Sequence, residues 1–445
     1  MTRGKREAMI ALGLRTHPEH DPPIAGKSAC SVRCLESTCN RGFLVLIQRG
    51  YKTELRPTVE QANQLARHCG VARFAFNWAL GRKIEHYQAT GKTLTYKEVD
   101  AEFNRRKPEE WPWAYETSKW AHGNAIRDCE KAFDNFFRRL KQGGPPGFPH
   151  FRSKHRSTPK YRVAGEAVKV EDDRIRLPVI GWVLLKRCGY LPTSGVKLLS
   201  ATVSQRAGRW FVSVNVEKTI VAPENQGPAV GLDVGLKSFV VGSDGSRLDP
   251  PKFFVRSLKK LRRLSRQHSR KQKGSANRRK SADKLAKLHF RIACQRGDFL
   301  HKASHHYASN FGLVCIEDLH IKGMVRNRHL ARAISDAGWG TFGVQLAYKC
   351  PWYGGKLVEA DRWYKSSKTC SVCGEEIGEL PLSIREWTCH KCGTHHDRDE
   401  NASNNLREYG RAAVTARTVV KARKPAENPA GETVTQEAFY GNSKL

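Results

Sequence analysis

Residues 229–235 read Ala-Val-Gly-Leu-Asp-Val-Gly, a short run in which one carboxylate, Asp233, stands among apolar residues and glycines. A charge inside such a run is costly to bury unless it is paired or bound to a metal ion. Residues 239–241, Phe-Val-Val, and the turn residues 243–245, Ser-Asp-Gly, follow. The pattern predicts two strands that are joined to a tight turn, with Asp233 as a candidate metal ligand.

Two further carboxylates occupy comparable positions later in the chain. Glu317 ends the apolar run 313–317, which predicts a short buried strand, and residues 356–360 predict another strand. Asp399 lies where a helix is expected to begin, and the positive end of a helix dipole favours an anion. Taken singly, each carboxylate could be a local cap or an ion-pair partner. Three carboxylates from two strands and a helix could together hold two Mg²⁺ ions for phosphodiester cleavage.

Two Cys-x-x-Cys-Gly knuckles lie between the second and third of these carboxylates. They contain Cys370 with Cys373 and Cys389 with Cys392, and 15 residues separate them. This spacing predicts a zinc ribbon in which four thiolates surround Zn²⁺ tetrahedrally, whereas a redox pair needs only one knuckle. Four sulfurs leave no open coordination position, so the zinc is expected to be structural. The nearby histidines are then spare, and we expect them at the surface: His390, His395 and His396.

The composition indicates a polyanionic partner. The 445 residues include 78 Lys and Arg against 43 Asp and Glu, a formal charge of +35. Such an excess opposes compact folding unless a polyanion neutralises it, and nucleic acid is the obvious one. No stretch approaches the apolar length of a membrane span, and the N-terminus is too poor in apolar residues for a secretory signal. We therefore expect a cytoplasmic protein without a membrane partner.

Of the 13 cysteines, the nine outside the two knuckles are scattered, which argues against a secreted disulfide framework. Cys30, Cys34 and Cys39 could bind metal, but they have no fourth partner nearby. A disordered leader over residues 1–41 is the favoured interpretation. Residues 411–445 are rich in Ala, Pro and charge without an apolar period, which predicts a disordered tail.

The remaining segments predict an α/β multidomain protein. Residues 42–57 and 160–222 carry short β-type runs and predict a β-barrel or small sheet, interrupted by helical residues 58–159. Thr58 is a predicted helix N-cap, with Gln61 completing a capping box. Residues 256–310 predict a strongly basic helical hairpin that could lie along a nucleic-acid backbone. The candidate phosphate-binding residues in the two helical regions are Arg67, Arg73, Arg82, Arg262, Arg263 and Lys271.

The three carboxylate segments resemble the split RuvC motifs of the TnpB family, nucleases that insertion sequences encode. The matching stretches are Gly231-Leu-Asp-Val-Gly235, Val314-Cys-Ile-Glu-Asp-Leu319 and Asp397-Arg-Asp-Glu-Asn-Ala402. The zinc ribbon also stands between the second and third motifs, as it does in that family. Upstream, residues 73–77 and 147–151 are similar to the family's N-terminal helical region, so the resemblance covers about Gly42 to Leu406.

This resemblance implies a domain plan. Residues 229–364 and 394–410 would form an RNase H-like (RuvC) nuclease, and residues 365–393 the inserted zinc ribbon. The barrel would be a wedge domain, and residues 58–159 a helical recognition lobe. Asp233, Glu317 and Asp399 would be the catalytic Mg²⁺ ligands, whereas Asp397 would be a neighbour without that role.

The resemblance also implies a guide RNA that is transcribed from the transposon end. The complex would cleave DNA beside a short transposon-adjacent motif, at the nucleoid of a prokaryotic cell. Three alternatives stay open from the sequence: a transposase that joins DNA ends itself, an RNA-guided repressor that does not cleave, and a zinc-ribbon transcription regulator. The guide sequence, the target motif, the cleavage pattern and the oligomeric state have no sequence signal.

Overall fold

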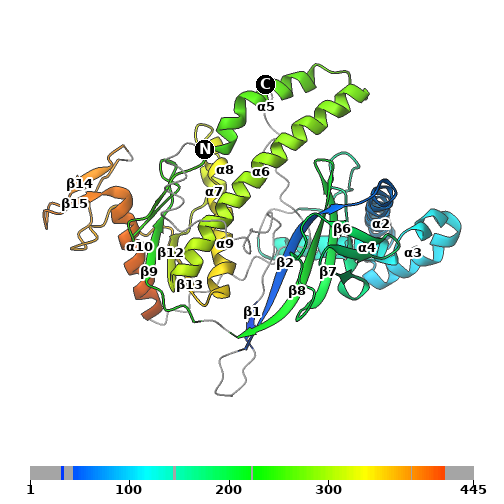
Figure 1. Cartoon of the computed structure of the whole chain (residues 1–445), viewed down its shortest axis with the longest axis horizontal. Helices are drawn as coiled ribbons and strands as arrows, with labels where there is room; N and C mark the ends of the chain where they lie inside the picture. Colours follow the sequence, from blue (N-terminus) through cyan, green and yellow to red (C-terminus); the bar gives the residue numbers. More distant parts are fainter. Residues whose placement is uncertain (1–31, 35–43, 144–146, 222–223, 382, 416–445) are drawn as a thin grey trace. The chain divides into compact units, whose positions relative to one another are not determined.

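The computed structural model describes residues 32–34, 44–143, 147–221, 224–381 and 383–415, which form two compact units (Figure 1). The N-terminal unit comprises residues 44–220, and the C-terminal unit comprises the described residues from 221 onward. Within the described residues, no helix is both long enough and apolar enough to cross a membrane.

The N-terminal unit is built on one sheet whose strands follow the order β3-β7-β8-β2-β6-β5-β4, with β1 paired to β2. A two-residue turn at Ala207 and Gly208 joins β7 to β8, and both residues have positive φ, as tight hairpin turns require. The strands are β1 (Val32–Cys34), β2 (Leu44–Arg56), β3 (Lys160–Ala164), β4 (Lys169–Val170), β5 (Arg174–Leu177), β6 (Gly181–Leu185), β7 (Lys197–Arg206) and β8 (Arg209–Val221). The end strands β3 and β4 show no mutual pairing among the described residues, so closure into a barrel stays a prediction.

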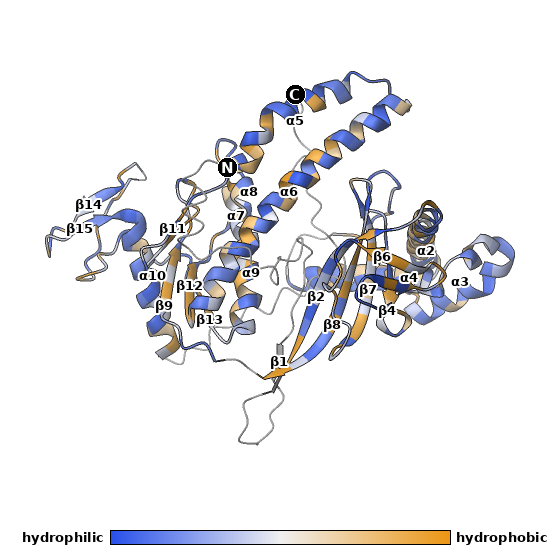
Figure 2. Ribbon diagram, viewed as in Figure 1, coloured by the Kyte–Doolittle hydropathy of each residue, from blue (hydrophilic) through white to orange (hydrophobic). Residues whose placement is uncertain are grey.

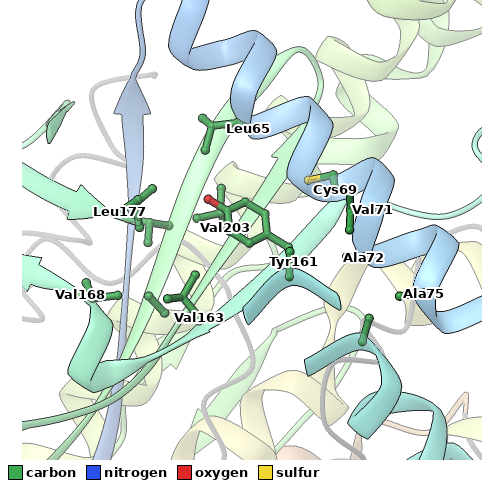
Figure 3. Packing of buried hydrophobic residues seen from close by; sticks show 14 of the residues in the cluster. Leu65, Cys69, Val71, Ala72, Ala75, Tyr161, Val163, Val168, Leu177 and Val203 are labelled. Carbon is green, nitrogen blue, oxygen red and sulfur yellow. The ribbon is translucent and has the colours of Figure 1, made fainter. Parts of the chain in front are cut away.

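Helices pack against this sheet to form the core of the N-terminal unit. They are α2 (Val59–Thr90), α3 (Tyr96–Glu110), η1 (Pro112–Glu116) and α4 (Lys119–Lys141). The predicted N-cap at Thr58 is confirmed, since Thr58 and Gln61 form a complete capping box. Leu65, Cys69 and Ala72 share one face of α2 at helical spacing, and they lie against sheet residues such as Tyr161 (Figure 3).

The C-terminal unit contains a five-stranded sheet in the order β11-β10-β9-β12-β13. Its strands are β9 (Ala229–Asp233), β10 (Val240–Gly242), β11 (Arg247–Leu248), β12 (Leu313–Glu317) and β13 (Lys356–Ala360). Strands β9, β12 and β13 are mutually parallel, while β10 and β11 run antiparallel to their neighbours. Leu232 pairs with Ile316, so the next residues, Asp233 and Glu317, end neighbouring parallel strands at the same edge of the sheet.

Alternating side chains of this sheet enter two separate apolar layers. Leu232 and Ile316 belong to the larger core, to which α6 (Ala276–Asn310) and α9 (Trp339–Trp352) contribute. Cys315 and Val358 instead pack with Leu406 of α10 (Arg398–Thr415), on the opposite face. The sheet therefore lies between helices on both faces, a common way for a parallel sheet to bury its two surfaces. The remaining helices are α5 (Phe253–Ser269), α7 (Ile321–Met324) and α8 (Ala331–Ala337).

Helix α10 approaches the central strand unusually closely. A Cβ atom on Gly231 of β9 would lie 2.0 Å from the backbone oxygen of Ser403 and 2.4 Å from the backbone nitrogen of Arg407. Only a glycine permits this contact between a strand and a helix. The contact fixes the start of α10, where Asp399 lies, relative to Asp233 two residues further along β9.

Two sequence predictions for the chain ends need correction. Residues 32–34, which were expected in a disordered leader, form β1, and Cys34 pairs with Val45 of β2 in its register. Residues 411–415, which were expected in a disordered tail, continue α10, because Ala413 and Val414 pack against the apolar layer that this helix shares with β12 and β13. The other residues of the two predicted segments, with Cys30 and Cys39 among them, lie outside the described residues.

Candidate metal sites in the C-terminal unit

The structure brings the three predicted carboxylates to one edge of the C-terminal sheet. Asp233 is the last residue of β9, Glu317 is the last residue of β12, and Asp399 lies in the first turn of α10. Burial raises the pKa of Asp233 to about 8, and the negative charges of Glu317 and Asp399 add to the rise. The three side chains therefore share one electrostatic environment with an excess of negative charge.

Hydrogen bonds hold the other two carboxylates. The Ser366 hydroxyl donates to Oε1 of Glu317 over 2.6 Å. Nη1 of Arg385 lies 3.3 Å from Oδ1 of Asp399, and the arginine side chain is about half exposed. Glu317 is thus fixed by a buried residue, whereas Asp399 faces an arginine that solvent can reach.

Asp397 has a different role from Asp399. Its Oδ1 accepts hydrogen bonds from the backbone N–H groups of Asp399, at 2.9 Å, and Glu400, at 3.1 Å. Its other oxygen pairs with Arg247 over 3.0 Å. Burial opposes the charged form, but the Glu400 amide and Arg247 outweigh burial and hold the pKa of Asp397 below its usual value. Asp397 therefore caps α10, which leaves Asp399 as the carboxylate beside Asp233.

The four predicted cysteines come together as their spacing predicts. The ligand atoms of all four lie within 4.8 Å of one another. Among the described residues, no other group of three or more His, Cys, Asp or Glu side chains gathers this closely. The Cys370 and Cys392 sulfurs are 3.7 Å apart, and the Cys373 and Cys389 sulfurs are 3.6 Å apart. Thiolates placed tetrahedrally at about 2.3 Å from zinc would be separated by about 3.8 Å, so the cluster is consistent with structural zinc.

The fold around the cysteines follows from two similar turns. Gly374 and Gly393 each follow a knuckle with positive φ and donate their backbone N–H to the backbone oxygens of Cys370 and Cys389, respectively, at 2.9 Å. A short hairpin of β14 (Glu386–Thr388) and β15 (His395–Asp397) supports the second knuckle and leads directly into α10. The ribbon is therefore continuous with the helix that carries Asp399.

One histidine departs from its predicted position. His396 was expected at the surface, but it is buried, and its Nε2 lies 3.1 Å from the Cys370 sulfur. Its ring also packs against Trp387, with 4.6 Å between ring centroids. The alternation of β15 turns His396 inward while His395 stays exposed. His396 is placed to hydrogen-bond a metal-bound thiolate without being a ligand itself.

Polar residues of α10 connect the ribbon to the carboxylate edge. The side-chain amides of Asn401 and Asn405, one helical turn apart, both donate to the backbone oxygens of Ser366 and Thr369. The Asn401 side-chain oxygen also accepts from the backbone N–H of Ser371, in the first knuckle. The residue that holds Glu317 is thereby anchored to the helix that carries Asp399.

Sequence reasoning missed this connection. The signal for Asn401 was present in the third motif, where a buried-face asparagine directly follows the acidic residues. Ser366 has no comparable signal, since serine is common in loops.

The six predicted phosphate-binding residues differ in their surroundings. Arg67 pairs with Glu116, and Arg82 pairs with Glu85 and Glu102, so these two arginines already have acidic partners within their own unit. Arg73 is partly buried on α2. Arg262 and Arg263 are exposed on α5, and Lys271 is partly exposed just after it. Figure 2 shows that hydrophilic residues make up much of α5 and α6.

Three protein-family models match the chain. A Cas12f1-like TNB domain matches residues 339–406, a model described as "Probable transposase" (OrfB, IS605) matches residues 211–328, and a helix-turn-helix domain matches residues 47–92. The first of these spans the ribbon and the beginning of α10. The second spans Asp233 and Glu317.

Two relatives match over nearly the whole of their own length. A protein of Streptomyces pristinaespiralis named "Putative RNA-guided DNA endonuclease" is 36% identical over 88% of this chain and 96% of that protein. A protein of Escherichia coli K12 named "Putative RNA-guided DNA endonuclease InsQ" is 31% identical over 88% of this chain and 99% of that protein. A Cas12f1 chain, solved by cryo-EM with sgRNA and target DNA, is 16% identical, with a TM-score of 0.32 over 81% of this chain and 98% of that chain.

Proposed function

The chain belongs to the TnpB (OrfB, IS605) family, and from this membership we propose that it is an RNA-guided endonuclease that cleaves DNA beside a short transposon-adjacent motif. The observation that carries the proposal is the convergence of Asp233, Glu317 and Asp399 at one sheet edge, where the pKa of Asp233 rises to about 8. Carboxyl groups with strongly perturbed pKa values cluster at functional sites, which supports a chemical role for this group of three.

The sheet of the C-terminal unit supports the proposed nuclease domain over residues 229–364 and 394–410. Three antiparallel strands followed by two parallel ones, in the order β11-β10-β9-β12-β13, would form the sheet of the RNase H-like domain that the family membership implies. The ribbon of residues 365–393 interrupts this domain between β13 and α10. The sheet of strands β2 to β8 and the helices α2 to α4 would supply the wedge and the recognition lobe.

The carboxylates suit Mg²⁺, which prefers oxygen ligands. Bound between them, two Mg²⁺ ions would activate a water molecule and stabilise the leaving oxygen of a phosphodiester. Asp233, Glu317 and Asp399 would hold these ions; the three carboxylates interact electrostatically but do not gather as tightly as the four cysteines.

The chain's own residues prepare this site. Ser366 orients Glu317, Asp397 fixes the first turn of α10 and thereby Asp399, and Gly231 lets that helix approach Asp233. Asp233 must lose its proton before it can act as a ligand, and Arg385 and Arg398 lower its pKa in part. We propose that the zinc of the four cysteines is purely structural and braces α10.

Guide RNA and target DNA are the proposed partners, because the +35 charge needs a large polyanion. In an RNA-guided complex, base pairing reads the target while the protein contacts backbone shape and a short duplex motif. The exposed Arg262 and Arg263 of α5 are better placed for phosphate contacts than Arg67 and Arg82, which have acidic partners.

The test begins with RNA that copurifies with the protein, which is sequenced and compared with the transposon end. The complex is then given DNA that carries the complementary target. We expect Asp233→Ala to abolish cleavage and to leave DNA binding intact, while Asp283→Ala, a control at an exposed position of α6, cuts normally.

Three outcomes would overturn the proposal. Unchanged cutting by the Asp233→Ala complex would remove the nuclease assignment, and binding without cutting by the unaltered protein would make it an RNA-guided repressor. Joining of transposon ends by the protein without RNA would make it a transposase.

A further inference from the structure

Trp363 is more exposed than any other large hydrophobic side chain among the described residues, at 84%. Single exposed apolar residues are common on protein surfaces and by themselves need no explanation. Trp363 differs because the segment that carries it is held firmly and adjoins the carboxylate edge.

The backbone of this segment is fixed from several directions. The Trp363 backbone N–H donates to Oδ1 of Asp361 over 2.8 Å, and the Asp361 backbone N–H donates to the Tyr409 hydroxyl over 3.3 Å. The next residue, Tyr364, turns inward, packs against Tyr409 in a tilted arrangement with 4.7 Å between ring centroids, and donates its hydroxyl to the Asn405 backbone oxygen. Tyr364 therefore anchors the segment to α10, while its neighbour Trp363 is held out in solvent.

Both ends of the segment contact the end of β12. Ala360, three residues before Trp363, pairs with Glu317, and Ser366, three residues after it, donates its hydroxyl to Glu317. Three residues of chain span at most about 11 Å. The Trp363 backbone therefore lies within about 11 Å of both points at which the chain contacts Glu317.

Charged side chains of both signs lie near Trp363. Arg362, Lys365 and Lys368 lie within five residues of it, as do Glu359 and Asp361, and ion pairs join Arg362 to Asp318 and Lys365 to Glu376. Exposed aromatic rings beside cations are the usual means of binding single-stranded nucleic acid, because bases stack on the ring while the cations follow the phosphates. With three cations near the ring and a net charge of +35 on the chain, a base is a better chemical match for this position than an apolar protein segment.

We propose that Trp363 is a stacking platform that holds one base of a DNA single strand beside the Asp233, Glu317 and Asp399 edge. Trp363 is a substrate-positioning residue and takes no part in the bond cleavage. This inference rests on the proposed nuclease function and names the form in which that site receives its substrate, as an unpaired strand with an unstacked base.

The test uses the complete protein–RNA complex under single-turnover conditions, with Trp363→Ala, Trp363→Phe and the control Val344→Ala. Val344 is an exposed apolar residue on α9 of the same unit. Loss of one stacked base costs about 5- to 150-fold in affinity. We expect Trp363→Ala to slow cleavage within that range, Trp363→Phe to retain most of the rate, and Val344→Ala to match the unaltered protein.

A second set of substrates separates stacking from a structural role. Each carries a single abasic nucleotide at a different position around the cleavage point. We expect one abasic position to slow the unaltered complex about as much as Trp363→Ala does, and to cause little further loss in that variant, because both changes remove the same contact.

The outcomes distinguish this inference from the proposed function. If the unaltered complex cuts DNA and the Trp363→Ala complex cuts equally fast, stacking by Trp363 is refuted. Stacking is also refuted if each abasic substrate slows the Trp363→Ala complex as much as it slows the unaltered complex. If no complex cuts, the failure lies with the nuclease assignment. If Trp363→Ala lowers the sedimenting mass and leaves the abasic profile unchanged, Trp363 faces a second protein chain and the inference is overturned.

Discussion

Protonation of Asp233 should control how tightly the carboxylate edge binds divalent cations. Its pKa of about 8 lies about four units above the ordinary 3.8, which corresponds to about 6 kcal/mol disfavouring the charged form. A metal ion binds the ionised carboxylate, so it must displace the proton below pH 8. The ionised fraction is about 1% at pH 6, about 9% at pH 7 and about 91% at pH 9. Apparent Mg²⁺ affinity should therefore rise about ninetyfold between pH 6 and pH 9, provided that Asp233 is the titrating ligand.

The assay is calorimetric titration of the zinc-loaded, nucleic-acid-free protein with Mg²⁺, in buffers of different ionisation enthalpy. We expect release of about one proton per binding event at pH 7 and almost none at pH 9. Asp233→Asn should lose both the proton release and the pH dependence. Glu317→Gln removes a negative charge that raises the pKa of Asp233, so its pH dependence should shift to lower pH even though its affinity falls.

The same pKa predicts a sign for stability. A carboxyl group whose pKa is raised on folding contributes stability that is complete below its ordinary pKa of 3.8 and is lost as the pH rises to about 8. The metal-free protein should therefore lose stability between about pH 4 and pH 8, and Mg²⁺ should restore it most strongly above pH 8. Proton release that is absent at pH 7, or equal in Asp233→Asn, would refute the assignment of Asp233 as a ligand.

Three further changes test the surrounding structure. Gly231→Ala forces a side chain into the backbone of α10, so the free energy of unfolding should fall by at least about 1–3 kcal/mol and the melting temperature with it. The control Gly378→Ala, whose new methyl group meets open space, should have little effect. Ser366→Ala removes the 2.6 Å hydrogen bond to Glu317, worth about 1.5–3 kcal/mol for a charged acceptor, so single-turnover cleavage should fall about 10- to 150-fold, with recovery in Ser366→Thr. Zinc chelation or Cys389→Ser should abolish cleavage in step with the measured zinc content. If Mg²⁺ alone restored cleavage by the chelated protein, the zinc would not be needed to brace α10.

The elements that could be predicted from sequence are those with a strong local signal. Strands β12 and β13 begin and end where the apolar runs 313–317 and 356–360 predict, because both are buried and bounded by polar residues. The capping box of Thr58 is likewise a local pattern with its own chemistry. The four cysteines cluster as predicted because zinc-ribbon spacing encodes the geometry of two turns.

What could not be predicted depends on contacts between distant segments. The burial of His396 depends on Trp387 and Cys370, which approach it only after the ribbon has folded. Ser366 is one of many serines until β12 places Glu317 beside it. The close approach of α10 to Gly231 is also invisible locally, since a glycine in a strand could equally mark a bulge.

The position of α10 in the chain has a consequence for synthesis. Translation produces β9 and β12 well before α10, and N-terminal regions generally fold first as they leave the ribosome. A nascent chain that ends within the ribbon carries Asp233 and Glu317 but lacks Asp399, and the face of β9 at Gly231 is still uncovered. Incomplete polypeptides from interrupted translation would therefore carry only two of the three carboxylates, so under the proposed function an aborted product would lack a complete metal site.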